Sequence, residues 1–175
     1  ALLIDGDCIE FAHIGDSRAY RLRPGADGEF EQISTDHTFV QRLLNEGRIT
    51  PEEAEHHPHK NVIMRVLGDV DASPELELKT LDAVPGERWV LSSDGLDAVV
   101  SLSEIEQVMR STDDLSEIAD TLIAMTLERG APDNVTVVSL QVIDREVLPV
   151  DEPVGPSSLP ESALPDSIVA EQEVS

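Results

Sequence analysis

The chain has 175 residues, of which 40% are hydrophobic and 27% are charged, as is ordinary for a folded protein. Its 36 acidic residues outnumber its 12 basic residues and give a formal net charge of −24. Such a charge repels the phosphates of nucleic acids and of anionic membranes, which argues against a nucleic-acid partner. No apolar run reaches the length that crosses a membrane. The length predicts one domain and an additional segment.

The single cysteine, Cys8, cannot form a disulfide within the chain. This fits a reducing compartment, and we expect a cytoplasmic protein. Cys8 lies in an apolar segment, so we interpret it as a small buried hydrophobic residue.

The first part of the chain predicts a meander of antiparallel strands. Residues 1–4 and 8–14 are predicted strands joined by the tight turn Asp5-Gly-Asp7. Residues 17–23 and 30–33 are the predicted third and fourth strands. Because the first segment is already strand-like, with no methionine and no lead-in, we expect the sequence to be cut from a longer chain.

Two helices are predicted next, followed by a histidine-rich loop. Residues 38–45 have apolar side chains at helical spacing before Gly47, and Thr50-Pro-Glu-Glu53 has the residue types of a helix start. The segment His56-His-Pro-His59 invites a metal-binding interpretation. Pro58 keeps the rings off one helical face and no cysteine is near, so we favour a solvated loop over a weak metal site.

The second half predicts strands at residues 76–81, 88–91 and 134–143, with the middle one buried and ending at the turn Asp94-Gly95. Two helices are predicted between the last two strands. One runs from Ser103, as its N-cap, to Met109. The other is amphipathic, and its core-facing residues are Leu115, Ile118, Ala119, Leu122 and Ile123.

Residues 144–175 differ in composition from the part before them. The segment is acidic, contains five prolines and lacks aromatic residues. It cannot bury enough apolar surface to offset the entropy of ordering, so we predict a disordered tail after a folded unit of residues 1–143.

Three aspartates stand at the ends of predicted strands, beside residues that turn the backbone. Asp16 follows Gly15, Asp94 precedes Gly95, and Asp133 follows a Gly/Pro turn. A single aspartate on a turn is most often only a turn cap. Three of them, with no histidine or cysteine alongside, favour a site for a hard cation, Mg²⁺ or Mn²⁺, whose bound water is a nucleophile for hydrolysis.

Asp69 and Asp97 are weaker candidates for the same site. Each lies in an ordinary polar surface context in the sequence.

The residues around the three aspartates resemble a known family. Gly15-Asp-Ser-Arg-Ala-Tyr20, Ser93-Asp-Gly-Leu96 and Ala131-Pro-Asp-Asn-Val135 resemble, in order and spacing, the later motifs of the metal-dependent serine/threonine protein phosphatases of the PP2C (PPM) type. Ile63-Met-Arg-Val-Leu-Gly68 looks like the family's Thr-Arg-x-Leu-Gly segment. Each motif alone is weak, but four in the right order are specific. The resemblance covers roughly residues 1–143, and the bacterial form is the most similar because of the flap implied by residues 39–60.

The resemblance implies an α+β fold, a four-layer sandwich of two antiparallel β-sheets flanked by α-helices. It implies that Asp94 and Asp133 are catalytic residues that bind the two Mn²⁺ or Mg²⁺ ions, and that Asp16 and Asp94 hold a third, weaker ion. Gly95 and Asn134 match positions that support these ligands. The implied reaction is attack of a metal-bound water on phosphoserine or phosphothreonine. The implied partners are phosphorylated proteins, with a serine/threonine kinase and its substrates as candidates.

The chain departs from the family in one respect. We do not find the family's amino-terminal motifs, which are an arginine that binds the substrate phosphate and an Asp-Gly-x-Gly-Gly whose aspartate bridges two metals. The turn Asp5-Gly-Asp7 lies in a hairpin and does not replace them. We therefore expect a phosphatase fragment that is inactive in isolation. The alternatives are a catalytically dead PP2C-like binding or regulatory module and a generic acidic cation-binding protein.

Overall fold

The computed structural model describes residues 1–60, 62–65 and 75–144. Within these residues the chain forms two antiparallel sheets and five helices. Asp69, Leu67 and Gly68 lie outside the described residues. So does the predicted disordered tail, except for Asp144, and the division into residues 1–143 and a tail stays a prediction.

The smaller sheet has the strand order β1-β2-β5, with bounds Leu2–Asp5, Cys8–His13 and Glu77–Asp82. The predicted hairpin is confirmed, because Asp5 pairs with Cys8 across a two-residue turn. Gly6 has a φ of 59° in this turn, which favours glycine. The prediction of a buried Cys8 was wrong, since its side chain is exposed. Successive side chains of a strand point to opposite faces, and Ile9 occupies the buried face.

The larger sheet has the order β4-β3-β6-β7, with bounds Phe30–Gln32, Arg18–Leu22, Arg88–Ser92 and Val137–Gln141. Strand β6 is internal, as predicted. The prediction of one continuous meander was wrong, because β2 and β3 belong to different sheets. The four residues 19–22 of β3 are buried on both faces of the strand. Such a strand fits a sheet that is covered on both sides.

The helices are α1 (Phe39–Asn45), α2 (Pro51–Glu55), α3 (Asp94–Asp97), α4 (Leu102–Ser111) and α5 (Leu115–Glu128). The predicted start of α2 is confirmed, because Thr50 and Glu53 form a reciprocal capping box. Helix α4 begins earlier than predicted, with Ser101 rather than Ser103 as its N-cap. Helix α3 was not predicted, since the turn at Asp94-Gly95 continues into a short helix.

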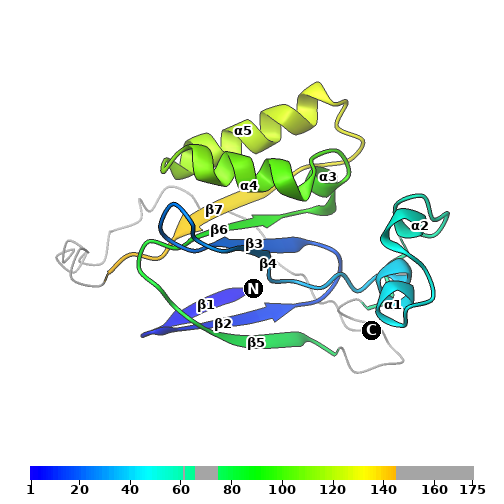
Figure 1. Ribbon diagram of the computed structural model, residues 1–175, viewed down its shortest axis with the longest axis horizontal. Coiled ribbons are helices and arrows are strands. Elements are labelled where there is room, and N and C mark those ends of the chain that lie inside the picture. Colours follow the sequence, from blue (N-terminus) through cyan, green and yellow to red (C-terminus); the bar gives the residue numbers. More distant parts are fainter. Residues whose placement is uncertain (61, 66–74, 145–175) are drawn as a thin grey trace, which may run out of the picture.

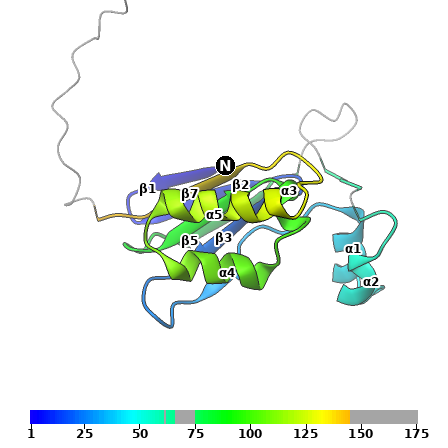
Figure 2. The same ribbon diagram turned by 90° about the horizontal axis from the view of Figure 1, so that it is seen from above.

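The layers are visible in two views (Figures 1 and 2). Helices α4 and α5 lie over the larger sheet, and the smaller sheet lies on that sheet's other side. Helices α1 and α2 lie beside the sandwich rather than over it. The α+β class with two antiparallel sheets and helices is confirmed. Among the described residues, no helix is long and apolar enough to cross a membrane.

The hydrophobic core has two parts, one on each side of the larger sheet. Between the sheets lie Ile9, Phe11, Ala19, Ile33, Trp89 and Val142. Between the larger sheet and the helices lie Tyr20, Leu22, Val90, Leu96, Val100, Ile105, Val108, Met109, Ile118 and Leu122. Each large apolar side chain buried in this way contributes about 1.5–3 kcal/mol to the free energy of unfolding. Both cores hold β3 and β6 in place. Strand β3 begins two residues after Asp16, and β6 ends two residues before Asp94.

Candidate metal centre

Asp94 begins helix α3 directly after the buried strand β6, and its side chain is exposed. The following residue must be glycine, because a Cβ at Gly95 would lie 2.3 Å from the carbonyl oxygen of Asn134. A contact that short cannot be accommodated without moving backbone. The close approach therefore brings the turn of Asp94 against the turn that contains Asp133 and Asn134.

Ser93 joins the same two turns by hydrogen bonds. Its Oγ donates to the Asn134 carbonyl oxygen at 3.2 Å and accepts the Thr136 N–H at 3.0 Å, and its own N–H donates to the Thr136 carbonyl oxygen at 3.1 Å. Asp133 is exposed, and its carboxylate accepts the N–H of Asn134 at 2.7 Å. Two segments whose contacting residues are 41 and 43 positions apart in sequence are thus fixed side by side.

Asp16 lies in the connection between β2 and β3, after Gly15, whose φ of 104° favours glycine. Burial raises the pKa of Asp16, and the negative charge of Asp94 raises it further. The two aspartates are therefore close enough to repel each other. In the described part of the chain, neither carboxylate has a hydrogen-bond or ion-pair partner in another residue. A divalent cation would relieve this repulsion, so the two residues fit a metal site.

The structure brings the three predicted ligands together only in part. Asp16 and Asp94 interact through their charges, and the turns of Asp94 and Asp133 are in contact. The three carboxylates do not form a group whose donor atoms all lie within 4.8 Å of one another, as far as the described residues go. Their role as metal ligands stays a prediction.

Asp97 was expected in an ordinary polar surface context, and this was wrong. Its side chain is only 7% exposed, and it accepts a hydrogen bond from the Tyr20 hydroxyl. Arg18 lies 3.5 Å away, and Ser92 donates to the same carboxylate at 3.4 Å. The first turn of α3 directs Asp97 toward β3, which sequence patterns did not reveal. Both Asp97 oxygens therefore already accept a hydrogen bond, one from Tyr20 and one from Ser92.

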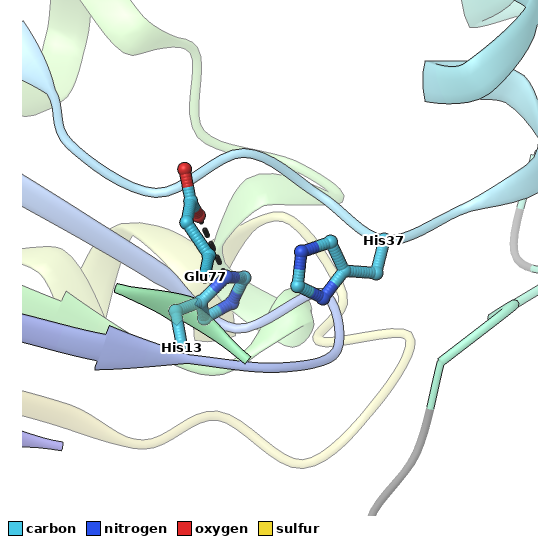
Figure 3. Close-up of side chains that lie close together, drawn as sticks. All are labelled: His13, His37 and Glu77. Carbon is cyan, nitrogen blue, oxygen red and sulfur yellow. Dashed lines mark hydrogen bonds and ion pairs between the residues drawn. The ribbon is translucent and has the colours of Figure 1, made fainter. Parts of the chain in front are cut away.

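A second polar cluster consists of His13, His37 and Glu77, which converge from β2, from the segment before α1 and from β5 (Figure 3). Their nitrogen and oxygen donors lie within 4.8 Å of one another. Sequence reasoning missed this cluster. The alternation of buried residues along β2, from Ile9 to Phe11, would have placed His13 on the buried face. No comparable signal pointed to His37.

The histidines of the segment 56–59 form no such metal-binding group within the described residues. His56 and His59 are exposed, and the rings of His57 and His59 lie near Phe39. This arrangement agrees with the loop that we favoured.

No family model matches the chain. Individual relatives do match. Serine/threonine protein phosphatase PstP of Mycobacterium tuberculosis is 46% identical over 144 residues, which are 82% of this chain and 27% of PstP. Protein phosphatase PhpP of Streptococcus pneumoniae is 39% identical over 147 residues, which are 82% of this chain and 57% of PhpP. The crystal structure of M. tuberculosis PstP matches with a TM-score of 0.74 and 44% identity, covering 82% of this chain and 58% of that chain.

This chain belongs to the bacterial PP2C-type serine/threonine phosphatases. A second solved structure shows the catalytic domain of PstP in complex with two manganese ions. It matches this PP2C chain with a TM-score of 0.70 and 44% identity, covering 82% of this chain and 57% of the PstP chain in that structure. The PP2C chain spans less than two thirds of each of these relatives. It therefore corresponds to only part of a PP2C domain.

Proposed function

We propose that the chain is the carboxy-terminal part of a metal-dependent protein phosphatase domain that hydrolyses phosphoserine and phosphothreonine in proteins. The observation that carries this proposal is the contact between the turns of Asp94 and Asp133, which Gly95 and Ser93 hold side by side. Neither the Asp94 nor the Asp16 carboxylate has a hydrogen-bond or ion-pair partner in another described residue, and the charge of Asp94 raises the pKa of Asp16. A relative of 44% identity that holds two manganese ions supports the choice of metal.

In this proposal Asp94 and Asp133 bind the two ions of the main centre, and Asp16 with Asp94 holds a third, weaker one. Bound Mn²⁺ or Mg²⁺ supplies positive charge for the phosphoryl group and lowers the pKa of a coordinated water. The chain's own residues hold the ligands. Ser93 and Gly95 set the distance between the turns of Asp94 and Asp133 through the contacts described above.

The net charge of −24 bears on substrate binding. A phosphorylated protein brings further negative charge, which a chain of this net charge repels. Cations at the aspartates would therefore be needed for the phosphate to approach as well as to react. The partners that we propose are phosphorylated proteins, with a serine/threonine kinase and its substrates as candidates.

The test uses the complete domain of which this chain is a part, with a phosphothreonine peptide and Mn²⁺. We expect Asp94→Asn and Asp133→Asn each to abolish most of the hydrolysis and most of the thermal stabilisation by Mn²⁺, because a ligand is lost. Asp16→Asn should keep most of the stabilisation while lowering turnover. Asp120→Asn, on the exposed surface of α5, is the matched control and should change neither.

Two results would contradict the proposal. Full Mn²⁺-dependent turnover in Asp94→Asn would show that this residue is not a ligand. Binding of Mn²⁺ without any hydrolysis in the complete domain would favour the alternative, a PP2C-like binding or regulatory module.

A further inference from the structure

We propose that His37 is a positioning residue that holds the Gly15–Asp16 turn through the unprotonated Nδ1 of its ring and so determines where Asp16 can bind a metal ion. The inference deepens the proposed function and rests on it in one respect, the role of Asp16 as a ligand.

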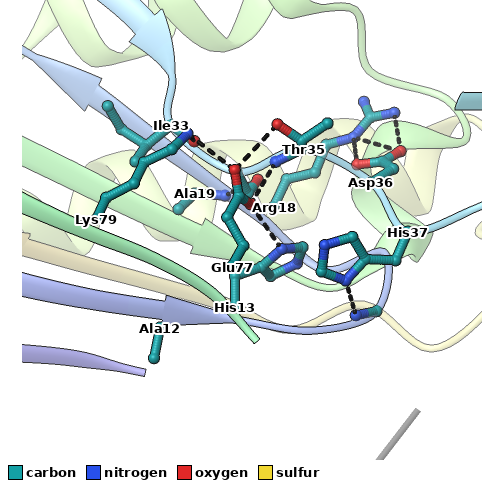
Figure 4. Close-up of polar contacts among 12 residues, drawn as sticks. Ala12, His13, Arg18, Ala19, Ile33, Thr35, Asp36, His37, Glu77 and Lys79 are labelled. Carbon is teal, nitrogen blue, oxygen red and sulfur yellow. Dashed lines mark hydrogen bonds and ion pairs between the residues drawn. The ribbon is translucent and has the colours of Figure 1, made fainter. Parts of the chain in front are cut away.

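His37 binds both polar backbone groups of Gly15. The Gly15 N–H donates to His37 Nδ1 at 3.2 Å, and the His37 N–H donates to the Gly15 carbonyl oxygen at 2.8 Å. Figure 4 shows the His37 ring beside Glu77, Thr35 and the Arg18–Asp36 pair. Gly15 immediately precedes Asp16 and has the left-handed φ of 104°. The position of Asp16 therefore depends on a backbone unit whose donor and acceptor are both held by one residue.

This contact specifies the tautomer of the His37 ring. A backbone N–H can only donate, so Nδ1 must present its lone pair and the single proton of the neutral ring lies on Nε2. An imidazolium would place a proton on Nδ1 and bring two donors face to face. Burial lowers the pKa of His37, as do His13 and Arg65, while Glu77 and Asp36 oppose the shift. The structure thus favours the neutral form that the contact needs.

The segment before His37 is fixed by Glu77. Glu77 accepts the N–H of Thr35 at 2.9 Å and its hydroxyl at 3.1 Å. The same carboxylate lies 3.3 Å from Nδ1 of His13, whose ring centroid is 5.1 Å from that of His37. Nε2 of His13 is buried and has no hydrogen-bond partner among the described residues. The short distance between the two rings means that the His13 ring limits where the His37 ring can move.

The residue between Thr35 and His37 is held from the other side of the turn. Asp36 accepts three hydrogen bonds from Arg18, two from Nε at 3.0 and 3.2 Å and one from Nη2 at 2.8 Å. Arg18 follows Asp16 by two residues, as Gly15 precedes it by one. Asp36 and His37 therefore hold the turn on both sides of Asp16.

The same cluster could be taken for a metal site, because it offers two imidazoles and a carboxylate. Binding of an ion at Nε2 of His37 would require its proton to move to Nδ1, against the N–H of Gly15. The hydrogen bonds therefore fit a clamp on the turn better than an ion site.

The test compares two substitutions in the complete domain. His37→Asn removes the ring but can present its side-chain oxygen to the Gly15 N–H, whereas His37→Leu offers no acceptor. The matched controls are His56→Asn and His56→Leu. His56 is exposed, and the one hydrogen bond of its ring among the described residues is with the Glu52 carbonyl oxygen, at 3.1 Å. Three quantities are measured by ¹H–¹⁵N NMR: the tautomer of His37, the Gly15 amide shift, and the Mn²⁺ concentration that broadens the Asp16 amide signal.

We expect His37 to carry its proton on Nε2. His37→Leu should shift the Gly15 amide signal and weaken Mn²⁺ binding at Asp16 by roughly 10–100-fold, the range typical when a residue that orients a ligand is removed. His37→Asn should restore most of both, and the two His56 variants should resemble the unchanged protein. A merely structural role of His37 would not be rescued by a shorter side chain that keeps only the acceptor.

Three results would overturn the proposal. A proton on Nδ1 of His37 would exclude the contact, and so would Zn²⁺ coordination that shifts the ring signals of His13 and His37 together. Unchanged Mn²⁺ broadening in His37→Leu would show that the clamp does not position Asp16. The absence of any broadening at Asp16 in the unchanged protein would instead overturn the ligand assignment, while the tautomer and the Gly15 signal would still show whether His37 holds the turn.

Discussion

Replacing Gly95 by alanine should separate the turns that carry Asp94 and Asp133. The added Cβ would lie 2.3 Å from the carbonyl oxygen of Asn134, and real Cβ atoms essentially never approach closer than 3.0 Å. One backbone must therefore move by about 0.7 Å, the difference between these two distances. The neighbour is main chain rather than a flexible side chain, so the movement is transmitted to Asp133, the next residue along.

This displacement is large on the scale of a binding site, which tolerates about 0.5 Å. We expect Gly95→Ala to bind Mn²⁺ more weakly, and the overpacking to lower the free energy of unfolding by about 1–3 kcal/mol. Calorimetric titration of Mn²⁺ into the complete domain measures the first effect, and urea unfolding measures the second.

Gly47→Ala is the matched control. Gly47 has a φ of 66°, and an added Cβ would meet no atom within 4 Å. The substitution should cost about 1–2 kcal/mol through backbone strain alone. The two variants should then lose similar stability, and only Gly95→Ala should lose Mn²⁺ affinity. Wild-type stability and Mn²⁺ affinity in Gly95→Ala would refute the reasoning, because the two turns would then not be in contact.

Three further predictions concern buried or titrating groups. Asp16→Asn should raise the melting temperature of the metal-free protein at pH 7, because the raised pKa of Asp16 means that its ionised carboxylate destabilises the fold. Calorimetry should show this gain disappear below about pH 4, where the Asp16 carboxyl is protonated in the unfolded chain as well. Because the pKa of His37 is lowered, urea unfolding should show stability that falls as the pH drops below about 6.5, and this fall should be smaller in His37→Asn. Glu87 is fully buried and accepts hydrogen bonds from Trp89 at 2.9 Å and from Arg23 at 3.1 Å. Glu87→Ala should therefore lower the free energy of unfolding, measured with urea, by about 3–5 kcal/mol. A loss below about 1 kcal/mol would contradict the role given to the buried Glu87–Arg23 pair.

Local patterns predicted the elements well where the cause is itself local. The capping residues Thr38 and Thr50 mark the starts of α1 and α2, and the glycine at the β1–β2 turn marks the hairpin. The pairing of strands was harder, because β2 and β3 are adjacent in sequence but join different sheets. That choice depends on which faces of β3 are covered, which is a property of the whole fold.

The candidate site shows the same difference between features with a local cause and features that depend on the whole fold. Asp16, Asp94 and Asp133 could be chosen from their turns and from the family motifs they lie in. The surroundings of Asp97 could not, since its burial depends on Tyr20 and Arg18 reaching it from another strand. The contact of His37 with Gly15 joins residues 22 positions apart, and no spacing rule predicts it.

The connection from His13 to Arg18 leaves one sheet and enters the other. Five peptide steps reach at most about 18 Å, and stacked sheets lie about 10 Å apart, so this connection has little slack. Sliding of one sheet over the other would therefore pull directly on Asp16. Shortening the connection would strain the sandwich, whereas lengthening it would let the layers slip and move Asp16 away from Asp94. The geometry therefore restricts the length of this segment as well as the type of residue at position 16.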